Sequence, residues 1–162
     1  MITIDLVMTP AINLAKKLKI SHNVHEYVHD PNSDSYGLEA AEKLQLAPER
    51  VFKTLIVRMD TGELVVAVIP VASMLSMKYI AKAVGAKKAE MASKADAERS
   101  TGYVLGGISP MGQRKKLKTV IHSTAQAYPT IFVSAGRRGL EIELSPEDLR
   151  KAVNAIFAEI CQ

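Results

Sequence analysis

The sequence predicts a single-domain α+β fold with a mixed β-sheet, and three observations predict it. A chain of 162 residues fits one domain and leaves no room for two full-sized ones. Strand-like runs follow one another with helices inserted among them, instead of alternating one for one as in a doubly wound fold. Two neighbouring apolar runs separated by a tight turn indicate an antiparallel hairpin.

The N-terminal part is predicted to contain two helices separated by an extended stretch. Thr9-Pro10 supplies an N-cap hydroxyl and a proline at the first helical position, and apolar residues at helical spacing continue to near Ile20. His25–His29 is expected to be extended, and Asp30–Asp34 has the composition of a turn. Leu38–Leu46 again has apolar residues on one helical face.

A hairpin is predicted next along the chain. Val51–Met59 and Leu64–Val71 are apolar at nearly every position, and Asp60-Thr61-Gly62 provides a tight connection between them. Strands with one solvated face alternate apolar and polar residues, so continuous apolar runs indicate strands covered on both faces. We therefore expect this hairpin at the centre of the sheet.

Shorter elements are predicted after the hairpin. Met77–Val84 has a helical pattern and is followed by Gly85, which suits a left-handed C-cap. Ala86–Met91 is expected to form a short strand, and Lys94–Arg99 a helical turn. Tyr103–Leu105 is expected to be extended and to lead into a glycine-rich segment.

The C-terminal part is predicted to hold three short strands and a final helix. Thr119–His122 and Thr130–Ser134 are β-like, Ala135–Gly139 is expected to be a turn, and Leu140–Leu144 alternates as a strand does. Ser145-Pro146 gives an N-cap and a first-position proline, with acidic residues in the first turn. The apolar stripe of this helix is expected to contain Leu149, Val153, Ile156 and Ile160.

The composition limits the classes of protein to which the chain can belong. A formal net charge of +4 permits a polyanionic partner without requiring one. Cys161 is the only cysteine, which excludes an intrachain disulfide and a cysteine zinc site and favours a reducing, cytoplasmic compartment. No apolar run reaches the roughly 18 residues of a membrane span. Residues 1–7 lack the basic charge of a signal peptide, so we expect a domain over 8–162 preceded by a short extension.

Lys53 is the first candidate for a functional residue. It interrupts the apolar run Val51–Val57, and charged side chains are almost never fully buried without a partner. One interpretation is that its ammonium group reaches water at the entrance of the strand. The other is a fixed cation in a pocket, which would hold a phosphate or a carbonyl oxygen.

Three further segments offer binding groups. The paired glycines of Gly102–Pro110 could expose N–H groups as an oxyanion hole, although a bulge or tight corner is the simpler interpretation. Ser134–Gly139 could cradle a phosphate or a ribose, or could be a hairpin turn with solvated arginines. The basic run Arg114–Lys118 could contact phosphates by charge, or could be a solvated loop without aromatic residues for base stacking.

The histidines favour neither a metal site nor a catalytic triad. His22, His25 and His29 have spacings that would suit a metal site on a helix, but in an extended stretch His22 and His25 face opposite sides. His122 is expected to be structural, and the sequence has no nucleophile elbow. We therefore expect neither a metal nor a cofactor.

Five short motifs occur in order along the chain. They are Met8-Thr9-Pro10-Ala11, His29-Asp30-Pro31, Phe52-Lys53-Thr54-Leu55, Ser100-Thr101-Gly102-Tyr103 running to Gly106-Gly107-Ile108-Ser109-Pro110, and Ser134-Ala135-Gly136-Arg137-Arg138-Gly139-Leu140. Together they resemble the YbaK/EbsC family of aminoacyl-tRNA editing domains, in its YbaK branch of Cys-tRNA(Pro) deacylases. Each motif is weak alone, but five in this order over one domain are specific.

The resemblance implies a fold like the editing domain that is inserted in bacterial prolyl-tRNA synthetases. Its mixed, largely antiparallel sheet would be partly curled into a barrel with surrounding helices. The implied reaction is hydrolysis of the aminoacyl ester of a mischarged tRNA, chiefly Cys-tRNA(Pro). Such an enzyme is needed because cysteine and proline are similar in size and are poorly discriminated by the synthetase.

The resemblance also implies roles for particular residues. The implied catalytic residues are Lys53, Gly106 and Tyr27, and the implied substrate- and tRNA-binding residues are Gly107, Ser109, Ser134, Gly136 and Arg137. The nucleophile would be the thiol of the substrate itself, which also suggests the enzyme class of lyases. The implied partners of this monomeric, cytoplasmic protein are the acceptor 3′ end of tRNA(Pro) and, transiently, prolyl-tRNA synthetase.

The sequence departs from the family pattern at one of these motifs. Ala135 and Arg137 stand where glycine and lysine are expected, and arginine keeps the charge but changes its geometry. Sister branches remove alanine and other small residues, so a deacylase for another small amino acid is an alternative. A non-catalytic module that binds a tRNA 3′ end or a synthetase is the other.

Overall fold

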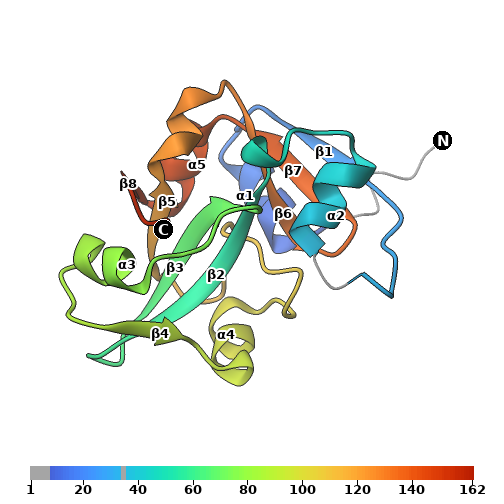
Figure 1. The fold of residues 1–162 in the computed structure, drawn as a ribbon. Helices are drawn as coiled ribbons and strands as arrows, with labels where there is room; N and C mark the ends of the chain where they lie inside the picture. The colour runs from blue at the N-terminus through green and yellow to red at the C-terminus, as the bar shows by residue number, and fades with distance from the viewer. Residues whose placement is uncertain (1–7, 34–35) are drawn as a thin grey trace.

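The computed structural model of the protein describes residues 8–33 and 36–162 and shows two β-sheets with helices around them (Figure 1). The helices are α1 (Pro10–Lys17), α2 (Tyr36–Lys43), α3 (Met77–Ala83), α4 (Lys94–Thr101) and α5 (Pro146–Val153). The strands are β1 (His22–Glu26), β2 (Phe52–Met59), β3 (Leu64–Pro70), β4 (Ala89–Met91), β5 (Lys118–His122), β6 (Ile131–Arg137), β7 (Leu140–Leu144) and β8 (Ile156–Ala158). Short 3₁₀ helices span Pro48–Arg50 and Ser123–Ala127.

The described strands pair in two sheets. The smaller sheet has the order β1-β7-β6 and is antiparallel throughout. The larger sheet has the order β4-β2-β3-β5-β8, in which β2 pairs antiparallel with β3 and β4 while β5 pairs parallel with β3 and β8. A parallel bridge between Val51 and Phe132 joins the two sheets. The α+β class and the mixed pairing are confirmed, although the strands do not close into a barrel.

The β2–β3 hairpin forms as predicted and lies inside the larger sheet. Its register runs from Phe52 opposite Pro70 to Arg58 opposite Leu64. Successive residues of a strand point to opposite faces. One face of β2 and β3 joins the core that contains β6, β7 and α1, whereas the other packs beneath α3. The hairpin is therefore covered on both faces, as its continuous apolar runs predict.

Helix starts also follow their sequence signatures. The Thr9 hydroxyl accepts the N–H of Ile12 and caps α1, and the Ser145 hydroxyl accepts the N–H of Asp148 and caps α5. Thr9 additionally donates its hydroxyl hydrogen to the carbonyl of Ala135. This buried hydrogen bond ties α1 to β6, so the first motif has a structural function besides helix capping.

The predictions for two elements around the glycine-rich segments are wrong. Tyr103–Leu105 is not a strand but part of a loop, because the Tyr103 hydroxyl donates to the carbonyl of Met111 at 2.6 Å and draws the chain around itself. Ala135–Arg137 is not a turn but the end of β6, which carries an irregularity between Ser134 and Arg137. Only Arg138 and Gly139 form the turn into β7.

The chain end also differs from its prediction. Helix α5 stops at Val153 because Asn154 adopts a left-handed C-cap with φ of 54°. Ile156 consequently falls in β8, and Ile160 and Cys161 are buried in the core beneath α3 instead of continuing the helix or fraying.

Near the N-terminus, the extended stretch is β1 over His22–Glu26, three residues earlier than the expected start at His25. Asp34, the last residue of the expected turn, lies outside the described residues.

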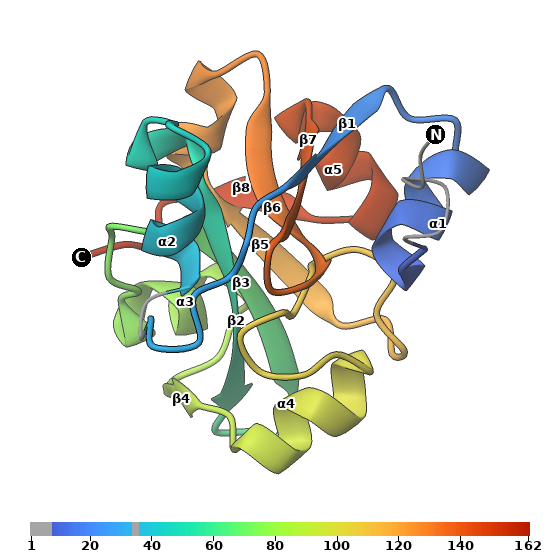
Figure 2. The same ribbon diagram turned by 90° about the vertical axis from the view of Figure 1, so that its right-hand side faces the viewer.

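The two sheets place three distant segments together. Figure 2 shows the β6–β7 turn beside the loop that follows α4, and the Arg138 Nη2 atom donates to the carbonyl of Leu105 across this junction at 2.9 Å. Helix α2 approaches from the other side, where the α-carbon of Gly37 leaves no room for a side chain beside Val71. Among the described helices, none has the length and apolarity that a bilayer crossing requires.

Candidate active site

A pocket of about 300 Å³ lies where α2, β2, the loop after α4 and the β6–β7 hairpin meet. No single element could form it, since each contributes only a few side chains. Its lining consists of Tyr27, Tyr36, Gly37, Phe52, Lys53, Thr54, Leu55, Val71, Leu105, Gly106, Ile108, Ser134, Arg137, Arg138 and Glu141.

The structure brings most of the candidate residues to this pocket. The lining includes five of them, namely Tyr27, Lys53, Gly106, Ser134 and Arg137. Three others, Gly107, Ser109 and Gly136, are not among the lining residues of the described chain. The functional roles inferred for all eight residues remain predictions, but the convergence of the first five on one pocket is a geometric fact.

The three residues outside the lining have structural reasons for their positions. The N–H of Gly107 donates to the carbonyl of Val104, and a β-carbon at Gly107 would lie 2.9 Å from the α-carbon of Arg137. Ser109 is fully buried, and its hydroxyl accepts the N–H of Met111. A β-carbon at Gly136 would approach the ring of Tyr103 to 2.8 Å. Close packing therefore explains these glycines and this serine without a ligand.

Lys53 supplies a fixed positive charge at the pocket wall. It is the second residue of β2, opposite Ile69, and its side chain is half-buried. Within residues 8–33 and 36–162, no carboxylate lies within ion-pair distance of its ammonium group. The pocket position favours the interpretation of Lys53 as a cation that can receive a ligand.

Glu141 is a site residue that the sequence analysis missed. Its carboxyl lines the pocket, yet the residue is only 7% exposed, and burial raises its pKa to about 8. The carboxyl takes part in none of the ion pairs among the described residues. Alternation in Leu140–Leu144 suggests an ordinary solvent-facing carboxylate. The signal that identifies Glu141 as a site residue is the pairing of β6 with β7, which places it opposite the candidate residue Ser134.

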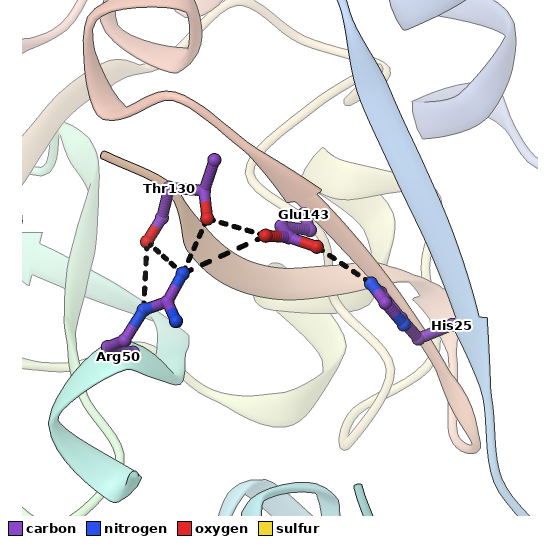
Figure 3. A network of polar contacts seen from close by, with 4 residues as sticks. All are labelled: His25, Arg50, Thr130 and Glu143. Atoms are coloured by element: carbon purple, nitrogen blue, oxygen red, sulfur yellow. Dashed lines mark hydrogen bonds and ion pairs between the residues drawn. The ribbon is translucent and has the colours of Figure 1, made fainter. Parts of the chain in front are cut away.

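Glu143, two residues further along the same face of β7, has the opposite environment (Figure 3). His25 Nε2 lies 2.9 Å from its Oε1, and the Thr130 hydroxyl and the Arg50 guanidinium contact its Oε2. Burial alone would raise the pKa of Glu143, but these hydrogen bonds and the charges of His25 and Arg50 lower it. Among the described residues, Glu143 thus has several partners, whereas the Glu141 carboxyl group has none.

The remaining polar groups of the pocket differ in how they are engaged. Burial, aided by the charge of Glu141, raises the pKa of Tyr27 to about 12, so this phenol is a hydrogen-bond donor at neutral pH. The Ser134 hydroxyl accepts the N–H of Gly136 at 3.1 Å. The Thr54 hydroxyl is buried and has no hydrogen-bond partner within the part of the chain that the structure describes.

Arg138 closes one side of the pocket mouth. Its guanidinium carbon lies 3.9 Å from the ring centroid of Tyr36, and its Nη2 atom is bonded to the carbonyl of Leu105. Arg138 therefore connects α2, the loop after α4 that contains Leu105 and Gly106, and the β6–β7 turn. Gly106 lies directly beneath this contact, with φ of 92°, and a β-carbon there would be 2.6 Å from Arg138 Nε.

We expect Gly106→Ala to disturb this contact and to lower activity about tenfold or more, because the new methyl group must displace Arg138 and Tyr36. Gly62→Ala is a matched control. Gly62 has nearly the same φ, 90°, but lies in the β2–β3 turn, where a β-carbon would approach only the end of the Arg58 side chain, at 4.0 Å. Both variants should lose a similar amount of stability, about 1 kcal/mol, from backbone strain. Equal activity of the two variants would show that Gly106 is needed only for its backbone conformation and not for the close contact with Arg138 and Tyr36.

The histidines make separate contacts. His29 Nδ1 lies 2.7 Å from the buried carboxylate of Glu39, which also accepts the N–H of Asp30 and so braces the loop before α2. His122 Nδ1 accepts the N–H of Ile160 and has the structural role expected for it. Among the described residues no group of three or more potential ligands could hold a metal ion.

Fold and pocket together define a small α+β protein whose site can hold a polar ligand between fixed charges and a glycine loop. Residues 30–152 match the family model described as "Aminoacyl-tRNA editing domain", and the chain belongs to that family. A protein of Enterococcus faecalis, "Putative Cys-tRNA(Pro)/Cys-tRNA(Cys) deacylase EbsC", is 40% identical over 153 residues, which are 94% of this chain and 92% of the relative.

Solved structures show the same fold at lower identity. A hypothetical protein, 21% identical, superposes with a TM-score of 0.85 over 95% of this chain and all of its own. A structure described as "a putative trans-editing enzyme for prolyl tRNA synthetase", 18% identical, superposes with a TM-score of 0.78 over 96% of this chain and 99% of its own. Both lie below the identity at which more than a fold can be transferred.

Proposed function

We propose that the protein is a trans-editing deacylase that hydrolyses the ester of misacylated tRNA, chiefly Cys-tRNA(Pro). The observation that carries the proposal is the convergence of Lys53, Gly106 and Tyr27 on one pocket of about 300 Å³. A pocket of this size suits a small amino acid and part of a ribose. The name of the Enterococcus relative supports both the reaction and the amino acid. A deacylase is a hydrolase, so the lyase class expected from the sequence is wrong.

In this reaction the protein positions the ester substrate and stabilises the charge that develops on its carbonyl oxygen. In the described lining, the Ser134 hydroxyl accepts the N–H of Gly136 in its own strand, and there is no histidine or cysteine that could act as a base or nucleophile. A substrate thiol can fill this role by attacking its own ester carbonyl carbon. The bond from that carbon to the ribose oxygen then breaks, the oxygen takes up the proton that the thiol has lost, and a cyclic thioester leaves, which water opens to free cysteine.

Lys53 and Gly106 are suited to the charge that develops on the carbonyl oxygen during this attack. Lys53 offers an unpaired ammonium group at the pocket wall, and the Gly106 N–H donates to no backbone acceptor within residues 8–33 and 36–162. Donors that are already in place when charge develops stabilise a transition state most effectively. Tyr27, which lines the same pocket, would donate its hydroxyl hydrogen as well.

The partners follow from the same site. Arg137 and Arg138 are exposed at the pocket rim, where they would contact phosphates of the tRNA acceptor 3′ end. The weakly basic chain, with few exposed aromatic residues for base stacking, favours a transient complex with prolyl-tRNA synthetase that supplies selection of the tRNA body. A monomeric, cytoplasmic protein fits this role.

The test is release of labelled amino acid from Cys-tRNA(Pro), Ala-tRNA(Pro) and Pro-tRNA(Pro). We expect cysteine to be released about 100-fold faster than alanine, since alanine lacks the intramolecular nucleophile, and proline to be retained. Equal release of alanine would refute the thiol mechanism and indicate an alanine-type deacylase. Protection of the tRNA without release of any amino acid would instead indicate the non-catalytic binding module.

A further inference from the structure

We propose that the Glu141 carboxylate is the subsite for the α-ammonium group of the esterified amino acid, so that the enzyme requires a free α-amino group. The inference rests on the proposed function and deepens it, because it names the substrate class as esters of unmodified amino acids. N-acylated and peptidyl esters would be rejected at this point of the pocket.

The Glu141 carboxyl group makes no ion pair with the described residues. Removing a carboxylate from water without a partner is costly, and proteins seldom retain such a group unless a ligand satisfies it. The pocket lining contains three cations, Lys53, Arg137 and Arg138, but none lies within 4.0 Å of the Glu141 carboxyl. Arg138 is engaged instead with Tyr36 and Leu105.

Glu143 differs from Glu141 in its surroundings. Both carboxylates lie on one face of β7, and the protein surrounds Glu143 with His25, Thr130 and Arg50. A merely structural carboxylate on this face is therefore given partners. Glu141 lies opposite Ser134 and, together with Tyr27, lines the pocket instead of contacting a partner of this kind.

The ligand expected here offers a matching charge. An ester of cysteine or of another small, uncharged amino acid carries a single cationic group, its α-ammonium, on the carbon next to the reacting carbonyl. Charge-assisted hydrogen bonds of an ammonium group to a carboxylate are short and strong, and fixing the α-carbon would orient the ester within the pocket that Lys53 also lines.

Binding should therefore release protons. The ionisable groups that line the pocket with Glu141 are Tyr27, Tyr36, Lys53, Arg137 and Arg138. In the free protein burial raises the pKa of Glu141 to about 8, so the carboxyl is mostly protonated at pH 7. An ammonium group in contact with it favours the carboxylate and expels that proton.

The kinetic test uses three esters of a tRNA(Pro) acceptor minihelix: cysteinyl, N-acetylcysteinyl and 3-mercaptopropionyl. All three keep the thiol, but the last two lack the α-ammonium group. Each enzymatic rate is divided by the uncatalysed rate of the same ester. The wild-type protein should prefer the cysteinyl ester by about 10- to 100-fold, the range expected for one charge-assisted hydrogen bond.

Glu141→Gln should lower the normalised rate on the cysteinyl ester by the same factor and leave the mercaptopropionyl ester within about threefold of wild type. Glu143→Gln, on the same strand, is the control and should leave the preference unchanged. An equal loss on all three esters with Glu141→Gln would overturn the subsite, as would a wild-type protein without preference.

A binding measurement separates this inference from the proposed function. The probe is the non-hydrolysable 3′-cysteinylamide of adenosine, titrated calorimetrically at pH 7 in two buffers of different ionisation enthalpy. Wild type should release close to one proton per ligand bound, and Glu141→Gln should release almost none. Equal proton release by both proteins would overturn the subsite. Absence of cysteine release by wild type would refute the deacylase alone, since the titration still decides the role of Glu141.

Discussion

Replacement of Lys53 by alanine is expected to slow cysteine release from Cys-tRNA(Pro) by about 100-fold or more while the protein remains folded. Removing one preorganised group that stabilises transition-state charge typically costs two to three orders of magnitude, about 3 to 4 kcal/mol. The half-buried Lys53 side chain has no ion-pair partner among the described residues, so its loss leaves no orphaned charge behind. The free energy of unfolding should change by less than about 1 kcal/mol.

Two further variants define the origin of this effect. Lys53→Arg keeps the positive charge but replaces a compact ammonium group by a planar guanidinium, and we expect partial activity. Arg58→Ala removes an exposed cation near the other end of the same strand and should leave activity unchanged. Single-turnover deacylation and urea unfolding measure the two quantities. Unfolding of Lys53→Ala, or its full activity, would contradict the assignment of Lys53 to the site.

Much of the fold is predictable from the sequence because the determining interactions are local. Thr9 and Ser145 cap the helices that they precede, and the β2–β3 hairpin follows from its apolar runs and turn. The failures occur where distant contacts decide. The Tyr103 hydroxyl pulls its segment into a loop through Met111, and a left-handed Asn154 ends α5 before its apolar stripe is complete.

The site was accessible from the sequence only in part. Lys53 is visible because a charge interrupts a buried strand, and Gly106 because paired glycines are unusual. The adjacent Gly107 cannot be separated from Gly106 locally, since only the tertiary fold shows that its N–H is bonded to Val104 and that it packs on Arg137. Glu141 is hidden by the regular alternation of its strand, which suggests the same environment for Glu141 and Glu143.

Glu141→Gln is expected to stabilise the protein above pH 8. A carboxyl group with a pKa of 4.5 in the unfolded chain and about 8 in the folded one binds a proton more tightly when folded. Between these pH values the native state holds more protons than the unfolded state, so the free energy of unfolding falls as pH rises. At 1.36 kcal/mol per pKa unit, the total loss is at most about 5 kcal/mol.

A neutral glutamine at this position does not ionise and avoids this loss, but its buried amide costs about 1 to 3 kcal/mol of unsatisfied hydrogen bonding. The net gain above pH 8 is therefore about 2 to 4 kcal/mol, and it should vanish or reverse near pH 5. Glu143→Gln must behave oppositely. The pKa of Glu143 is lowered in the folded state, so its ionised form stabilises the protein above about pH 4.5 and its removal costs stability at neutral pH.

Urea unfolding of the wild type and both variants at pH 5, 7 and 8.5 measures these differences. A stability curve of Glu141→Gln that runs parallel to that of the wild type would show that the Glu141 carboxyl is not the group that titrates. The predicted gain in stability of Glu141→Gln and its predicted loss of selectivity have the same physical origin. The Glu141 carboxyl group has no cationic partner among the described residues, and its ionisation therefore destabilises the free protein. Because no described side chain occupies that position, a cationic ligand can bind there.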